Sequence, residues 1–425
     1  NFTEINLIDN YGSAARVDFK VIDMEGKPVD DAKVEFKIYN YAEFVTAVSK
    51  YTDRQGDTFL SAGKGDMIVW ASKDGRFGYT KVSFGKDKNV TIQLAYDEKH
   101  TPKEQDLDII PPTENAIIPT VTSAQKAENN KRLAQEDALR NAYIATFPTE
   151  ESMKNYRIPA AIPYIIKARG NWRTIQTFVE KHEGNIDRAL KLLSTLTDKD
   201  LRDMPMDILE DNMNATSNEV SPRVEYEMIL KPYKKFFAKV FRKDAQKFRN
   251  DPSLLVDWVK KNIKLNPDTR AMQIPQTPIS VWESRITDDR GRDIFFVDVA
   301  RSLGIEAQKD LVTWKLQYKK GKDWVDVDFD TSVQEAAKTG KLILDYSPTE
   351  YLDDPKYYTH FTISKIVYGR TWIMNFEEGQ LDMGGGATWA NTFKKGATLD
   401  EGTYLLVTGQ RMADGSVMAH TQFFT

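Results

Sequence analysis

The sequence of 425 residues contains no cysteine and only four histidines. The absence of cysteine excludes disulfides, thiolate metal sites and catalysis by a thiol within this chain. The histidines are His100, His182, His360 and His420, and no two of them have the spacing of a local metal-ligand pair. We therefore predict that the chain holds no metal ion and no other cofactor.

An excess of positive charge and long apolar runs are also missing. The 59 basic residues are outnumbered by 63 acidic ones, which gives a formal net charge of −4 and no basic footprint for nucleic acid. No apolar run approaches the roughly 18 residues of a membrane span, and no signal peptide is present. Because the chain begins at Asn1 and stops inside an apolar strand, Thr421 to Thr425, we expect a processed or engineered fragment of a longer protein.

Sequence motifs of common enzyme classes are absent too. The chain has no HExxH, P-loop, nucleotide-binding GxGxxG or GxSxG pattern. The run Gly384 to Gly386 is interpreted as a flexible hairpin tip, since a bare glycine run lacks the rest of a phosphate-binding loop. With 40% hydrophobic and 29% charged residues the composition is that of a globular protein, and the length predicts two to four domains.

Residues 1–97 are predicted to form a β-sandwich. Short alternating segments separated by turns indicate strands at positions 17–22, 34–39, 67–71 and 90–94. The order of Asp23 to Val29, Thr52 to Gly56 and Gly65 to Ala71 is similar to prealbumin-like, Ig-like or carboxypeptidase-regulatory-like modules of bacterial surface proteins. That resemblance implies a spacer or binding module.

The middle of the chain changes from a linker to helices. Prolines and acidic residues predict a linker or extended strap over 98–124. Residues 125–250 are predicted to form a helical layer, with helices over 123–147, 175–196, 199–213 and 223–248.

Residues 340–425 are predicted to form an antiparallel β module. This segment is rich in aromatic residues, which either stack on sugar rings and grip peptides or pack in the strand core. They are Tyr351, Tyr357, Tyr358, Trp372 and Trp389.

The segment between these regions carries the most specific pattern. The stretch from Asp288 to Ile305, followed by Trp314 to Tyr318 and Gly321 to Phe329, resembles the core of the transglutaminase-like superfamily, which shares the papain-type plan of thiol enzymes. The resemblance implies a core over 251–339 and, with the helical layer, a likeness to large extracytoplasmic proteins of Bacteroides-type bacteria. The expected fold class is thus α+β and multidomain.

The resemblance also implies three catalytic positions, and two of them have lost their chemistry. The cysteine position falls on Asp289, or on Gly291 if the loop is shorter, and the histidine position falls on Val312. The aspartate position is kept as Asp328. Because a thiolate is activated by an imidazole that the carboxylate orients, Asp328 alone cannot perform this reaction.

Other roles for these residues follow from their surroundings in the sequence. Asp289 is interpreted as a residue that satisfies a helix N-terminus. Ser284 is a weak replacement nucleophile, since no histidine follows it before His360. We expect the inherited cleft to bind a ligand through Trp282, Trp324, Asp326 and Asp328.

We predict a non-catalytic binding or scaffold protein of the cell envelope, extracytoplasmic, whose cleft binds a peptide or a glycan. Two further interpretations stay open. One is an amide-bond hydrolase or transamidase that uses the remaining carboxylates or residues outside this fragment. The other is a structural spacer whose cleft is filled by side chains such as Val312. The sequence leaves the oligomeric state open.

Overall fold

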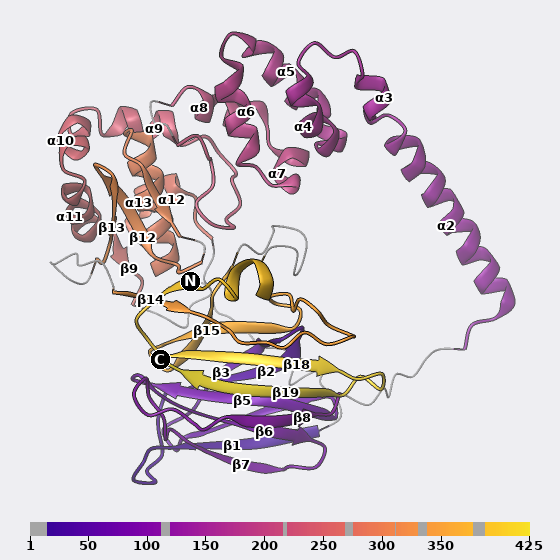
Figure 1. Cartoon of the computed structure of the whole chain (residues 1–425), viewed down its shortest axis with the longest axis vertical. Coiled ribbons are helices and arrows are strands. Elements are labelled where there is room, and N and C mark those ends of the chain that lie inside the picture. The colour runs from indigo at the N-terminus through magenta and orange to yellow at the C-terminus, as the bar shows by residue number, and fades with distance from the viewer. Residues whose placement is uncertain are drawn as a thin grey trace. The chain divides into compact units, whose positions relative to one another are not determined.

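The structure is a computed structural model of the chain (Figure 1). It describes residues 15–111, 120–215, 219–267, 275–310, 312–329, 338–376 and 387–425. The predicted hairpin tip at Gly384 to Gly386 lies outside the described residues. The fold is α+β with several separate sheets, as predicted.

The described residues form two compact units. Residues 120–310 and 315–329 make up the first, called the helical unit. The second, called the sheet unit, combines residues 15–111, 312–314 and 338–425. The segments predicted as an N-terminal sandwich and a C-terminal module therefore share one compact unit.

The strands of the sheet unit belong to four sheets. They are β1 (Ala15–Ile22), β2 (Lys33–Asn40), β3 (Glu43–Tyr51), β4 (Asp57–Ala62), β5 (Gly65–Lys73), β6 (Arg76–Phe84), β7 (Asn89–Gln93), β8 (Gln105–Ile109), β14 (Thr339–Leu342), β15 (Phe361–Val367), β16 (Arg370–Ile373), β17 (Ala397–Asp400), β18 (Tyr404–Arg411) and β19 (Val417–Phe424). The orders are β4-β1-β7, β3-β2-β5-β6, β16-β15-β18-β19-β8 and β14-β17. A single π-helical turn, η4, covers Trp389–Phe393.

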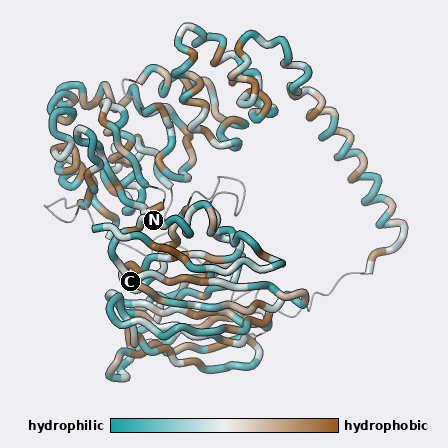
Figure 2. The backbone as a smooth tube through the Cα atoms, viewed as in Figure 1, coloured by the Kyte–Doolittle hydropathy of each residue, from teal (hydrophilic) through white to brown (hydrophobic). Residues whose placement is uncertain are grey.

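The sheets of this unit pack face to face because their strands alternate. Along β5, Val69 and Ala71 face the cluster shared with β1, β4 and β7, while Ile68 and Trp70 face the opposite way. Ile68 and Trp70 pack against residues of β8, β15, β18 and β19, so the sheet β3-β2-β5-β6 is apolar on both faces. Figure 2 shows hydrophobic residues along these strands and hydrophilic residues at the turns between them.

The five-stranded sheet has a covered and an uncovered part on its outer face. At β15, that face carries Phe361 and Ile363, which pack with the β14-β17 pair and with Trp389 and Phe393 of η4. Toward β19 and β8 the outward side chains are polar or exposed. The predicted linker over 98–124 supplies the edge strand, since β8 pairs antiparallel with β19.

The helical unit contains helices and two small sheets. Its helices are α2 (Ser123–Ile144), α3 (Glu150–Met153), η1 (Pro159–Ala161), α4 (Ile162–Lys167), η2 (Arg169–Asn171), α5 (Trp172–Lys181), η3 (Glu183–Asn185), α6 (Ile186–Ser194), α7 (Asp198–Asp203), α8 (Met206–Met213), α9 (Lys234–Val240), α10 (Ala245–Asn250), α11 (Ser253–Asn262), α12 (Pro278–Ser284) and α13 (Asp289–Ser302). Its strands are β9 (Lys264–Leu265), β10 (Ile286–Thr287), β11 (Ala307–Lys309), β12 (Leu316–Lys320) and β13 (Asp323–Asp326). Among the described helices, none combines the length and apolar character needed to cross a membrane.

Helix α13 is the centre of the second half of this unit. It buries Ile294, Val297, Ala300 and Leu303. The helix is in fact enclosed on every side from Ile294 onward, polar residues included. Those polar residues need partners inside the protein.

The predicted helix over 223–248 is wrong in its first half. Residues 219–233, which we call the strap, have no regular structure, and α9 begins only at Lys234. The carboxylate of Glu227 accepts hydrogen bonds from the backbone N–H groups of Val224 and Glu225, which fixes a turn. Pro232 disfavours helical geometry at the residue before it.

Candidate functional site

Helix α13 begins at the position where the resemblance to the transglutaminase-like superfamily predicts a nucleophile. The N-cap is Asp288, whose carboxylate accepts a hydrogen bond from the N–H of Gly291 at 2.7 Å. Asp289 follows as the first helical residue, with 79% of its side chain exposed and its carboxylate 3.1 Å from Arg292. At Gly291 a Cβ would lie 2.0 Å from the Thr287 hydroxyl oxygen, so even alanine does not fit without a shift.

Trp282, predicted to line the cleft, is packed in an aromatic cluster. Its ring stacks on Trp258 with centroids 5.7 Å apart and lies 5.3 Å from the ring of Phe241. The guanidinium of Arg285 sits 3.7 Å from the centroid of the Trp282 ring. Ser284, the weak alternative nucleophile, donates its hydroxyl to the carbonyl of Ile286 at 2.9 Å. The predicted cleft tryptophan is therefore a packing residue.

The β12-β13 hairpin carries three other predicted residues. The strands pair antiparallel, and Trp324 stands opposite Lys319, whose ammonium lies 5.6 Å from the indole centroid. The carboxylate of Asp326 accepts a hydrogen bond from the Gln317 amide at 2.7 Å and pairs with Lys315 at 3.1 Å. Asp328 follows the end of β13 and is exposed.

The structure gives these residues different packing partners. The ring contacts of the described residues join Trp282 to Trp258, and none joins it to Trp324. Val312 belongs to the sheet unit, where it packs against that unit's hydrophobic cluster. The described residues also contain no group of three or more His, Asp or Glu side chains placed to hold a metal ion.

A buried ion-pair network, which the sequence did not predict, holds the strap against α13. The carboxylate of Glu225 lies 2.5 Å from the ammonium of Lys309 and 2.8 Å from the guanidinium of Arg290. Lys309 also pairs with Asp293 at 3.0 Å. Burial raises the pKa of Asp293, and Lys309 opposes that shift.

Two further buried groups of this network have shifted pKa values. Burial, assisted by the nearby Arg301, lowers the pKa of Lys234 to about 7. The Lys234 ammonium donates to the carbonyls of Glu219 and Ser221 at 3.1 and 3.3 Å. Burial likewise raises the pKa of Asp298 well above its ordinary value. Because partners from the strap and α13 surround these groups, we assign them to structure.

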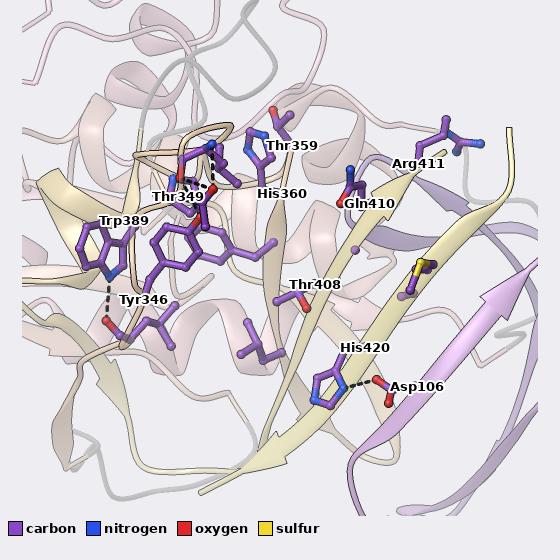
Figure 3. A pocket seen from close by; sticks show the side chains of 18 of the residues that line it. Asp106, Tyr346, Thr349, Thr359, His360, Trp389, Thr408, Gln410, Arg411 and His420 are labelled. Atoms are coloured by element: carbon purple, nitrogen blue, oxygen red, sulfur yellow. Dashed lines mark hydrogen bonds and ion pairs between the residues drawn. The ribbon is translucent and has the colours of Figure 1, made fainter. Parts of the chain in front are cut away.

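A cavity of about 1200 Å³ lies on the outer face of the five-stranded sheet, and we call it the sheet groove (Figure 3). Its floor is formed by side chains of β18, β19 and β8 that point to the same face. In one row across the strands, Thr408 stands opposite His420, and His420 stands opposite Asp106. In the next row Gln410 stands opposite Met418.

The wall of the sheet groove comes from residues 344–361 and from η4. Tyr346 donates its hydroxyl to the carbonyl of Leu352 at 2.9 Å and packs edge to face on Trp389 with centroids 5.5 Å apart. Trp389 is itself fixed, since its indole N–H donates to the carbonyl of Leu344 at 2.8 Å. Tyr351, by contrast, is 93% exposed. The wall thus offers one aromatic ring held in place and one that is open to a ligand.

Two of the four histidines line this groove, with opposite hydrogen-bonding character. Nδ1 of His360 lies 3.0 Å from the N–H of Lys356, which can only donate, so a neutral His360 carries its proton on Nε2. Nδ1 of His420 lies 2.8 Å from the carboxylate of Asp106, which can only accept when it is ionised. A neutral His420 therefore keeps Nε2 as an acceptor.

Sequence reasoning missed the sheet groove because its residues come from three separate segments. Asp106 lies within the predicted linker, and His360 and His420 are 60 positions apart in the sequence. The sequence does contain a sign of this groove. Thr408 and Gln410 in β18 are two residues apart, as are Met418 and His420 in β19, so each pair lies on one face of its strand. Only the pairing of β8 with β19 brings Asp106 beside them.

Of the aromatic residues predicted either to bind or to pack, Tyr357 and Trp389 are buried, and Tyr351 is exposed in the groove. Comparison with known proteins adds no family to these observations. No protein-family model matches the chain, and no curated protein matches it in sequence. The resemblance to the transglutaminase-like superfamily thus remains a prediction that rests on the motifs between Asp288 and Phe329.

Proposed function

We propose that this chain is a binding or scaffold protein of the cell envelope that holds a peptide or a glycan without cleaving it. The observation that carries the proposal is the sheet groove, a cavity of about 1200 Å³ with exposed aromatic and hydrogen-bonding side chains. Ligand sites of proteins are cavities of this kind, with a few polar groups among apolar ones. This proposal places the ligand site in the sheet unit, whereas the sequence predicted a site near Trp282.

We further propose that residues 251–339 are a degenerate transglutaminase-like core and residues 1–97 a prealbumin- or Ig-like module. For the core, the support is the motif order on α13 and the β12-β13 hairpin. An exposed Asp289 and an apolar Val312 stand where a thiol and an imidazole would be needed. Asp326 is engaged by Lys315 and Gln317, which favours a structural role for that carboxylate.

Two experiments on the full chain test this function. A screen by isothermal titration calorimetry of soluble glycans and peptides is expected to find a ligand whose binding weakens in Tyr351→Ala. An assay for ammonia and new amine ends with glutamine peptides and cell-wall peptides is expected to show no turnover. Turnover that disappears in Asp328→Ala would contradict the proposal and make the chain an amidase or transamidase.

A further inference from the structure

The floor of the sheet groove is a regular array of hydrogen-bonding side chains. Neighbouring strands lie about 4.8 Å apart, and side chains on one face of a strand repeat every two residues, about 7 Å. Thr408, His420 and Asp106 form one row of this array, and Gln410 lies in the next. Asp108 is on the same face of β8 as Asp106.

This array offers donors and acceptors side by side. When neutral, His360 presents an N–H and His420 presents an acceptor nitrogen. The Gln410 amide and the Thr408 hydroxyl each provide both functions. Hydroxyl groups of a sugar also donate and accept, so a polyhydroxylated ligand matches a floor of mixed character.

The charges of the groove disfavour an anionic ligand. Asp106, Asp108 and Asp345 contribute carboxylates to the lining. The guanidinium of Arg411 donates to the carbonyls of Gly415 and Tyr39 at 2.9 and 3.2 Å. Among the residues that line the groove, carboxylates outnumber arginine and lysine side chains, so an anion would meet an excess of negative charge.

An extended peptide is disfavoured at the edge of the sheet. Peptides commonly bind by adding a strand to an open edge, where main-chain groups are unpaired. At β8 the carbonyl of Asp108 already accepts a hydrogen bond from the Lys81 ammonium at 2.7 Å. Just beyond the strand, the N–H and carbonyl of Ile110 are both bonded to Asp66. An added strand would have to displace these contacts.

The aromatic wall and the size of the groove also suit an oligosaccharide. Tyr351 presents an open ring, and Tyr346 a ring fixed by its hydroxyl and by Trp389. The faces of sugar rings stack on such side chains, which cost little entropy to hold in place. The volume of about 1200 Å³ exceeds the roughly 300–1,000 Å³ usual for small-molecule sites, so the groove has room for a ligand of several sugar units.

We propose that the sheet groove binds a neutral oligosaccharide, with Tyr351 stacking on a sugar ring and Asp106, Gln410 and His420 bonding its hydroxyl groups. This proposal rests on the binding function proposed above and names the ligand class. The carboxylate of Asp106 has a double role, since it also fixes the ring orientation of His420.

The test is calorimetric titration of the full chain with neutral oligosaccharides built from glucose, mannose, xylose or N-acetylglucosamine. Neutral and cationic peptides serve as the comparison. We expect at least one oligosaccharide to bind, about tenfold more weakly to Tyr351→Ala and to Asp106→Ala. Tyr368→Ala is the matched control, because Tyr368 is 79% exposed in the same unit but does not line the groove, and it should bind as the wild type does.

The possible results separate the two proposals. If only peptides bind, and their binding weakens in Tyr351→Ala, the oligosaccharide proposal is overturned while the proposed binding function stands. If a ligand binds equally to wild type and to both groove variants, the groove is not its site and both proposals fail. Absence of binding for every sugar at millimolar concentration, with circular dichroism confirming a folded chain, also overturns the oligosaccharide proposal.

Discussion

Gly369, in the turn between β15 and β16, joins two sheets of the sheet unit. Its carbonyl accepts the indole N–H of Trp70 at 2.8 Å, and its φ of +76° lies in the left-handed region. A Cβ at this position would lie 2.7 Å from the carbonyl oxygen of Arg76. A side chain here would meet backbone strain and backbone atoms together.

We therefore expect Gly369→Ala to lower the free energy of unfolding by about 2–3 kcal/mol. Gly26→Ala is the matched control, because Gly26 has a φ of +79° and nothing within 4 Å of its Cβ position. It should cost only the backbone strain, about 1 kcal/mol. Urea denaturation measures both. Equal losses in the two variants would show that the contact with Arg76 does not constrain the turn.

Lys234 should make stability depend on pH near neutrality. Its pKa falls from an ordinary 10.5 to about 7 in the folded state, so between these values the unfolded chain binds more protons there than the folded chain. The contribution of Lys234 to the free energy of unfolding therefore rises with pH over that window, by up to about 1.4 kcal/mol per pH unit. Below pH 7 both states are protonated and the contribution is constant.

Comparison with Lys234→Met isolates this effect, because Asp298, whose pKa is raised, contributes a slope of opposite sign in both proteins. We expect the stability of the wild type relative to the variant to increase from pH 7 to pH 10 in urea titrations. A constant difference across this range would mean that Lys234 stays charged in the folded protein.

At the candidate site, the sequence predicted the features that neighbouring residues encode. It missed the contacts between residues that are far apart along the chain. The acidic start of α13 and the β12-β13 hairpin follow from local pattern, and both are present. Trp282 was expected in a cleft, yet its stacking on Trp258 depends on how α11 and α12 pack. No local spacing encodes that contact, nor the pairing of His420 with Asp106.

At the scale of elements, the strap is held by ion pairs in addition to the apolar contacts of Val220, Val224 and Tyr233. Glu225 and Lys309 form a buried ion pair, and Glu225 also pairs with the more exposed Arg290. Removing one partner of a buried ion pair leaves an uncompensated charge, so Glu225→Ala is expected to cost about 3–5 kcal/mol. The control is Glu183→Ala, since Glu183 pairs with Arg157 at the exposed surface and should cost at most about 1 kcal/mol.

Thermal unfolding followed by circular dichroism distinguishes these two variants. A marked drop in Tm for Glu225→Ala alone is the expected result. If Glu225→Ala unfolds like Glu183→Ala, the strap does not contribute to the stability of the helical unit, and its buried network is only a local arrangement.

Helix α2 is the opposite case, because none of its residues is buried. Its capping box at Thr122 and the alanine-rich sequence maintain it locally. We expect Ala134→Pro to reduce helical circular dichroism while leaving the Tm of the chain unchanged, since α2 contributes no core side chain. Ala300→Pro in the buried helix α13 is the contrast and should abolish cooperative unfolding. A lowered Tm in Ala134→Pro would reveal tertiary contacts of α2.

Local patterns predicted strands better than the helix boundaries. The alternation in β1 and β2 matches the observed strands to within one or two residues. The block from Ile175 to Leu196 was predicted as one helix and is two, α5 and α6, with Gly184 between them. Helical composition continues through such breaks, so periodicity alone does not locate them.

At the scale of the whole molecule, the sequence did not reveal that residues 15–97 and 338–425 share one unit. The continuous apolar run of β5 from Ile68 to Ala71 is typical of a strand covered on both faces. It did not show which segment supplies the second cover. Most of that cover comes from β15, β18 and β19, which lie more than 250 positions further along the chain, so no local spacing can encode it.

This arrangement predicts the behaviour of a fragment containing residues 1–97 only. Ile68, Trp70 and Phe77 are at most 2% exposed in the full chain, and the residues that cover them come from β8, β15, β18 and β19. The fragment would present this apolar face to water, so we expect it to bind a hydrophobic dye and to self-associate in sedimentation experiments.

Supplying residues 338–425 as a second polypeptide should suppress both effects, because the five-stranded sheet restores most of the cover. Ile68→Thr together with Phe77→Thr should reduce self-association of the fragment alone, whereas the same pair should destabilise the full chain. A monomeric, cooperatively folding fragment that binds no dye would instead make residues 1–97 an independent domain. The opposite effects of one pair of substitutions on fragment and full chain separate a lost internal interface from a general loss of stability.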